Sequence, residues 1–74
     1  MKVVLPNDVA AIKKAVDDGH TVYDGDPPYE VRKDHLGQYF IVCSLNNYSI
    51  GLHGMKDTPY EHELNGNGPF WYEA

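Results

Sequence analysis

Residues 31–43 read Val31-Arg32-Lys33-Asp34-His35-Leu36-Gly37-Gln38-Tyr39-Phe40-Ile41-Val42-Cys43, and this segment is the strongest indication of the fold class. Its first residues belong to an alternating strand, and Asp34 to Gly37 has the composition of a tight turn in which the glycine can supply a positive φ. Its last residues are apolar at consecutive positions, which is typical of a strand covered on both faces. The stretch therefore predicts two antiparallel strands and contains no catalytic motif.

Neighbouring segments extend this hairpin in both directions. A second turn at Leu45-Asn46-Asn47, where asparagine tolerates the left-handed region, predicts a further strand. The strands at about 29–33, 38–44 and 48–52 then form a central meander. The aromatic segment at about 70–72 follows the turn-forming residues Asn65 to Gly68 and predicts a C-terminal strand or a cover for the sheet.

The N-terminal part predicts one helix of about three turns over Asp8 to Asp18. Asn7 is the expected cap and Gly19 the expected left-handed residue after the last turn. Apolar residues recur on one stripe at a spacing of three and four, which predicts packing on a sheet. These are Val9, Ile12, Ala15 and Val16.

Two short β-branched segments complete the elements, an edge strand or extended lead-in at residues 2–5 and a short strand at 21–23. The predicted fold class is α+β, with one N-terminal helix packed on an antiparallel sheet of four or five strands. The length of 74 residues predicts a single domain, residues 1–74.

The period of two along the meander predicts which side chains face the helix. Val31, Ile41, Cys43, Ile50 and Leu52 are expected on the helix side. Phe40 and Val42 fall on the opposite face, where one helix cannot cover them. Either the C-terminal aromatic segment or a second copy of the protein, as a homodimer, is expected to shield them.

Composition excludes several function classes. A net charge of −5 disfavours direct binding to the nucleic-acid backbone, which requires lysine and arginine. The apolar run at the N-terminus is too short for a membrane span or a signal sequence, so we expect no membrane partner. The single cysteine permits no intramolecular disulfide and favours a cytoplasmic location.

The ionisable residues do not predict a site. His53, Asp57 and His62 share one loop region but have no spacing typical of a closed metal site, so no metal and no cofactor are expected. Cys43 stands in the most apolar strand and is predicted to be a buried core residue rather than a nucleophile. Asp24 and Asp26 are followed by prolines that interrupt a calcium loop, which favours an ordinary turn.

The aromatic residues carry the main functional signal. The chain has six tyrosines and one tryptophan, more than a core this small can bury, and both residue types favour protein interfaces. The predicted partner surface comprises the aromatics Tyr29, Phe40, Trp71 and Tyr72 with the acidic residues Asp24 and Asp26. No catalytic residue is predicted.

Several segments together resemble small uncharacterised proteins of bacterial phages and prophages. They are the helix end Ala15-Val16-Asp17-Asp18-Gly19, Thr21-Val22-Tyr23, Lys33-Asp34, Gly37-Gln38-Tyr39, Cys43, Ile50-Gly51-Leu52 and Leu64-Asn65-Gly66. The resemblance implies an accessory role and transfers no site residue.

The sequence thus predicts a non-enzymatic module that binds a host or phage protein, or itself, through an aromatic patch. One alternative is an acidic decoy that occupies the basic groove of a nucleic-acid-binding protein. Another is a small metal-dependent enzyme, which would need a pocket with convergent ionisable groups.

Overall fold

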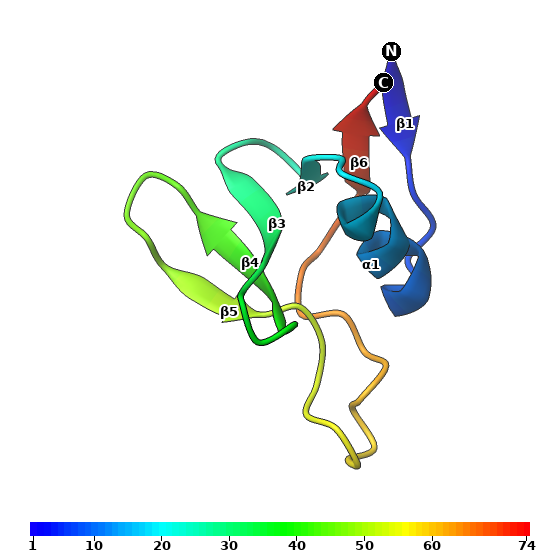
Figure 1. Cartoon of the computed structure of the whole chain (residues 1–74), viewed down its shortest axis with the longest axis vertical. Coiled ribbons are helices and arrows are strands. Elements are labelled where there is room, and N and C mark those ends of the chain that lie inside the picture. Colours follow the sequence, from blue (N-terminus) through cyan, green and yellow to red (C-terminus); the bar gives the residue numbers. More distant parts are fainter.

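One helix and six strands make up the chain in a computed structural model that describes residues 1–74 (Figure 1). In chain order they are β1 (Lys2–Val4), α1 (Val9–Asp17), β2 (Val22–Asp24), β3 (Tyr29–Lys33), β4 (Tyr39–Cys43), β5 (Ser49–Gly51) and β6 (Phe70–Glu73). All strand pairs are antiparallel and form one sheet in the order β1-β6-β2-β3-β4-β5. The α+β class and the meander are confirmed, but the predicted number of four or five strands is wrong.

The sixth strand comes from pairing between the two ends of the chain. β6 lies between β1 and β2, and Val3 is in register with Tyr72. Both termini consequently lie side by side (Figure 1). A pairing across almost the whole chain leaves no local pattern, so the sequence indicated β1 only as an edge strand or lead-in.

The helix is one residue shorter at each end than predicted, and its cap is different. The N-cap residue is Asp8, not Asn7, and no side chain caps the first turn. The backbone N–H of Asp8 donates to the carbonyl of Pro6 at 2.8 Å, so the chain turns tightly at Asn7 before the helix begins. The predicted left-handed end is confirmed at Gly19, where φ is 96°.

The strand at 29–33 is observed as predicted, and the other strand boundaries differ by one residue at one or both ends. Predicted strands at 21–23, 38–44, 48–52 and 70–72 are observed at 22–24, 39–43, 49–51 and 70–73. Positive φ values at Gly37 and Asn47 confirm the two predicted turns.

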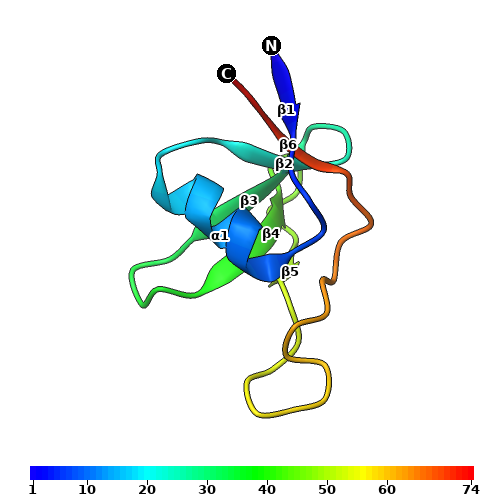
Figure 2. The same cartoon turned by 90° about the vertical axis from the view of Figure 1, so that its right-hand side faces the viewer.

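The hydrophobic core lies between α1 and one face of the sheet (Figure 2). Its fully packed members are Ile12, Ala15, Val22, Val31, Ile41, Leu52 and Phe70. The helix stripe and the helix-facing strand positions are therefore as predicted. Phe70 was not assigned to this face, and its burial shows that the C-terminal segment adds a strand instead of covering Phe40 and Val42.

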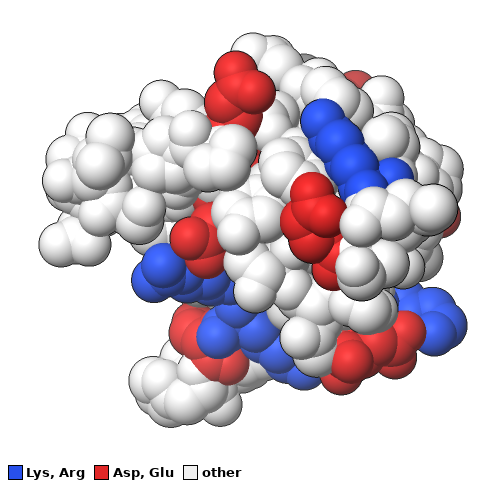
Figure 3. All heavy atoms as spheres, turned by 90° about the horizontal axis from the view of Figure 1, so that it is seen from above, with Lys and Arg blue, Asp and Glu red and all other residues white.

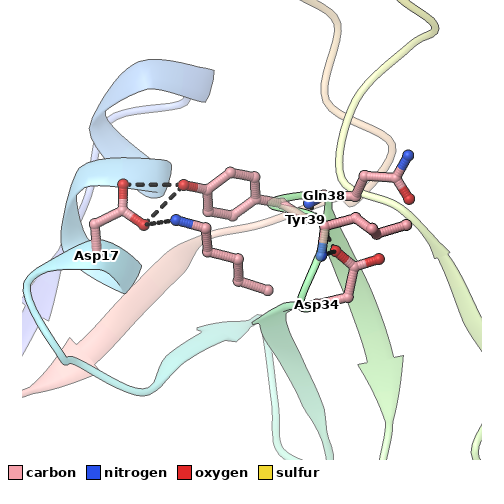
Figure 4. A network of polar contacts seen from close by, with 6 residues as sticks. Asp17, Asp34, Gln38 and Tyr39 are labelled. Carbon is pink, nitrogen blue, oxygen red and sulfur yellow. Dashed lines mark hydrogen bonds and ion pairs between the residues drawn. The ribbon is translucent and has the colours of Figure 1, made fainter.

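A polar cluster holds the last turn of α1 to β3 and β4 (Figure 4). The hydroxyl of Tyr39 donates to Asp17 at 2.7 Å from Oδ1, and Lys33 Nζ donates to the same oxygen at 3.1 Å. The bond from Tyr39, followed by that from Lys33, holds the pKa of Asp17 below its ordinary value of 3.8. Burial, followed by the same carboxylate, raises the pKa of Tyr39 above its ordinary value.

This cluster predicts acid-sensitive stability. Folding lowers the pKa of Asp17, so the ionised carboxylate stabilises the folded state. This stabilisation is complete above pH 3.8 and is lost as the pH falls through the lowered pKa. We expect Tyr39→Phe to reduce stability at about pH 7 and to have a smaller effect at a pH below the lowered pKa of Asp17, where the carboxylate is protonated. Urea denaturation of both proteins at both pH values measures this difference. An equal loss at the two pH values would contradict the role of the Asp17 carboxylate.

Candidate functional site: an acidic, aromatic pocket

Tyr29 of β3, Cys43 of β4 and Tyr48, the residue before β5, form a row of three side chains on the helix-facing side of the sheet. Tyr29 is in register with Cys43, and the backbone N–H of Cys43 donates to the carbonyl of Tyr48 at 2.8 Å. The small thiol thus stands between two tyrosines on neighbouring strands. Since adjacent strands are about 4.8 Å apart, the tyrosines start roughly 10 Å from one another, wide enough to admit a side chain.

This row is one wall of a pocket of about 430 Å³. Its floor is apolar, with Ile41 and Ile50 from the next row of the sheet. The opposite wall is the loop from Asn65 to Gly68. The tyrosines are accessible from solvent, with exposed fractions of 46% for Tyr29 and 62% for Tyr48.

Two carboxylates lie on the third side of the pocket. Asp24 ends β2, and its Oδ1 accepts a hydrogen bond from the backbone N–H of Gly68 at 2.7 Å. The other oxygen, Oδ2, accepts no hydrogen bond and lies against Gly66. A Cβ atom added to Gly66 would collide with this oxygen and would lie 2.9 Å from Cδ1 of Ile41. Asp26 follows in the exposed loop and forms no ion pair.

The loop that carries the two aspartates is joined to Pro69 and to β6 by hydrogen bonds to both backbone groups of Gly25. The N–H of Gly25 donates to the carbonyl of Pro69 at 2.8 Å, and Nε1 of Trp71 donates to the carbonyl of Gly25 at 2.6 Å. Gly25 and Gly68 both have positive φ, near 68°, which glycine adopts without strain. The loop from Asp24 to Asp26, which forms the acidic rim of the pocket, is therefore held in place by contacts with β6.

No cationic residue offsets the acids of this pocket. Its lining contains Asp24 and Asp26 but no lysine, arginine or histidine. Three other acidic side chains form ion pairs with lysine or arginine elsewhere, namely Asp17 with Lys33, Asp18 with Lys14 and Glu30 with Arg32. The pocket is consequently a local concentration of negative charge beside aromatic and apolar surface.

The structure separates the predicted partner surface into parts. Asp24, Asp26 and Tyr29 are brought together in the pocket. Tyr72 lies on the helix side, stacked on His20 with 3.9 Å between ring centroids. Phe40 and Trp71 belong to the opposite face of the sheet, so the six predicted residues do not form one patch.

The opposite face carries an aromatic and aliphatic ladder. The strand registers place Val4, Trp71, Tyr23, Glu30, Val42 and Ser49 in one row across all six strands. Within it Tyr23 and Trp71 lie 4.7 Å apart by ring centroids, and Nζ of Lys2 lies 4.4 Å from the Trp71 ring. Self-association through this face stays a prediction, which light scattering on the purified protein can test.

Sequence reasoning missed Tyr48 and the Asn65 to Gly68 loop as site residues. Tyr48 was one of the surplus aromatics, and the repeated Asn-Gly pairs marked a turn. The available signal was the alternation of the meander, which puts Tyr29, Cys43 and Tyr48 on one face. The approach of the loop to that face depends on tertiary packing alone.

The other candidate residues take the following places. Cys43 is buried, as predicted, with 6% of its surface exposed, and it lines the pocket wall between Tyr29 and Tyr48. Nδ1 of His53 is hydrogen-bonded to the Gly54 carbonyl at 2.8 Å, and His62 is an exposed neighbour of Glu61. No group of three or more His, Cys, Asp or Glu is placed to hold a metal ion.

Charges of both signs are intermixed on the face shown in Figure 3. This face therefore does not offer the single acidic surface that an imitation of nucleic acid requires. The helix α1 is too short to cross a membrane, and the chain has no other helix.

Comparison of the chain with protein-family models, with curated proteins and with solved structures gives no match.

Proposed function

We propose that this chain is a non-enzymatic protein-interaction module whose contact surface is the pocket between β3, β4, β5 and the Asn65 to Gly68 loop. The observation that supports it is the combination, in one pocket, of two accessible tyrosines, an apolar floor and two carboxylates without a cationic neighbour. Tyrosine at the mouth of a pocket is typical of residues that dominate binding energy at interfaces.

The composition of the pocket favours binding over catalysis. Cys43 has no histidine in the pocket that could act as its base, and the two aspartates are not accompanied by a nucleophile-activating group. Its two aspartates and two tyrosines are instead suited to contact with a partner protein. The resemblance to small phage and prophage proteins supports an accessory role in which a host or phage protein is the bound partner.

The distribution of charge gives less support to the acidic decoy. Asp17, Asp18 and Glu30 are engaged with neighbouring cations on the same molecule, which weakens the field that they present to a basic groove. The unpaired carboxylates of Asp24 and Asp26 lie in a pocket, where they suit a single inserted group.

A random peptide library selected against the wild-type protein tests the proposal. We expect enriched peptides whose affinity falls about fivefold in Tyr48→Ser, since loss of one aromatic contact costs about 1 kcal/mol. Tyr60→Ser is a matched control, because Tyr60 is also 62% exposed but lies outside the pocket. Fluorescence anisotropy with each labelled peptide gives the dissociation constants. Peptides that respond equally to both substitutions, or to neither, would exclude the pocket as the contact surface.

A further inference from the structure

We infer that the pocket binds one arginine side chain of the partner, an inference that rests on the proposed function and specifies its ligand. Charge is the first reason. The pocket lining carries two carboxylates and no cationic residue, so insertion of a cation neutralises charge that the fold leaves uncompensated. Among the twelve lining residues, the only formally charged ones are Asp24 and Asp26.

Hydrogen bonding gives the second reason. The backbone N–H of Gly68 donates to Oδ1 of Asp24, whereas Oδ2 of that carboxylate accepts no hydrogen bond from the protein. Asn65 and Asn67 line the opposite wall, where Nδ2 of Asn65 donates to the carbonyl of Gly51 at 2.8 Å. The guanidinium group has five N–H donors in a fixed plane and can reach several acceptors at once.

The aromatic row gives the third reason and is independent of the acids. Tyr29 and Tyr48 flank the small Cys43, so this wall of the pocket has a slot with a tyrosine on each side of the thiol. A guanidinium group stacks on aromatic faces, and its attraction to the ring increases where water is excluded.

The shape of the pocket agrees with the length of the side chain. Apolar floor residues Ile41 and Ile50 can contact the three methylene groups of arginine, and the carboxylate of Asp24 lies near Cδ1 of Ile41 at the end of that floor. Long cationic side chains commonly bury their stems on apolar surface while the charged group binds polar atoms. A lysine would place a compact ammonium group there, which lacks the planar face that the slot offers.

The test uses three small probes and the intact protein. N-acetyl-arginine methylamide is titrated into ¹⁵N-labelled protein, in parallel with the citrulline and lysine analogues. Citrulline keeps the shape of arginine without its charge. We expect the arginine probe to shift the amide signals of Gly25, Gly66 and Gly68, the lysine probe to bind about fivefold more weakly, and citrulline to cause no saturable shift.

Two variants localise the effect. Asp26→Asn is expected to weaken the arginine probe about fivefold, whereas Asp57→Asn removes an exposed acid outside the pocket and is expected to change the affinity less than about twofold. Equal binding of citrulline, equal or tighter binding of lysine, or equal effects of the two variants would overturn the inference.

The failure of this inference can be separated from that of the proposed function. Library peptides that depend on Tyr48 but contain no arginine, or that tolerate replacement of their arginine by citrulline, would overturn the arginine assignment and leave the interaction surface in place. Absence of any Tyr48-dependent peptide, together with Asp26-dependent binding of the arginine probe, would overturn the protein-binding function and support the ligand class.

Discussion

Phe70→Ala is expected to leave the chain largely unfolded at room temperature. The Phe70 side chain is fully buried between the sheet and the core residues of α1. Removal of a buried phenylalanine costs about 3–5 kcal/mol in lost burial and cavity formation. A single core in a domain of this size rarely supplies more than about 3–5 kcal/mol. Circular dichroism with urea denaturation measures the loss.

Phe70→Leu is the control for this prediction. Leucine keeps much of the buried volume, so we expect the variant to remain folded with a lower urea midpoint. A Phe70→Ala protein that unfolds at the same urea concentration as wild type would show that β6 is not part of the cooperative core. It would also contradict the placement of β6 between β1 and β2.

Trp71→Ala is expected to destabilise the protein by about 2 kcal/mol and to loosen the pocket rim. Trp71 is only partly buried, but its ring packs against Tyr23 and its Nε1 donates to the carbonyl of Gly25 at 2.6 Å. Loss of that bond leaves the Gly25 carbonyl without its indole donor, next to Asp24. Urea denaturation gives the stability, and hydrogen exchange of the Gly25 amide reports on the rim.

Trp71→Phe separates the two contributions. Phenylalanine keeps most of the ring packing and removes only the hydrogen bond, so we expect a loss of about 1 kcal/mol with faster exchange at Gly25. A Trp71→Ala protein with wild-type stability and wild-type exchange at Gly25 would refute the bracing role. The prediction of Trp71 as a partner-surface residue would be unaffected by that result.

Only some of the residues of the pocket were predicted from the sequence. Asp24, Asp26 and Tyr29 were predicted as partner-surface residues and lie together, because they belong to one short segment from the end of β2 to the start of β3. Phe40 and Trp71 were grouped with them by residue type, although alternation already separated Phe40 from the helix-facing side. Tyr72 follows the opposite alternation to Trp71 and so points to the helix side.

The local pattern of the chain determined its elements. The three-and-four spacing from Val9 to Val16 specifies the helix stripe, and the period of two specifies which meander positions are buried. Gly37 and Asn47 mark the two turns because few other residues accept a positive φ. These signals act between residues close in sequence, so composition and spacing were enough to predict them.

Tertiary structure alone decided how distant segments meet. The insertion of β6 between β1 and β2 and the approach of Gly66 and Gly68 to Asp24 each join residues more than forty positions apart. Their pairing depends on which closure of the chain buries the most apolar surface while satisfying backbone hydrogen bonds, a property of the whole fold. The acidic, aromatic pocket arises from that closure.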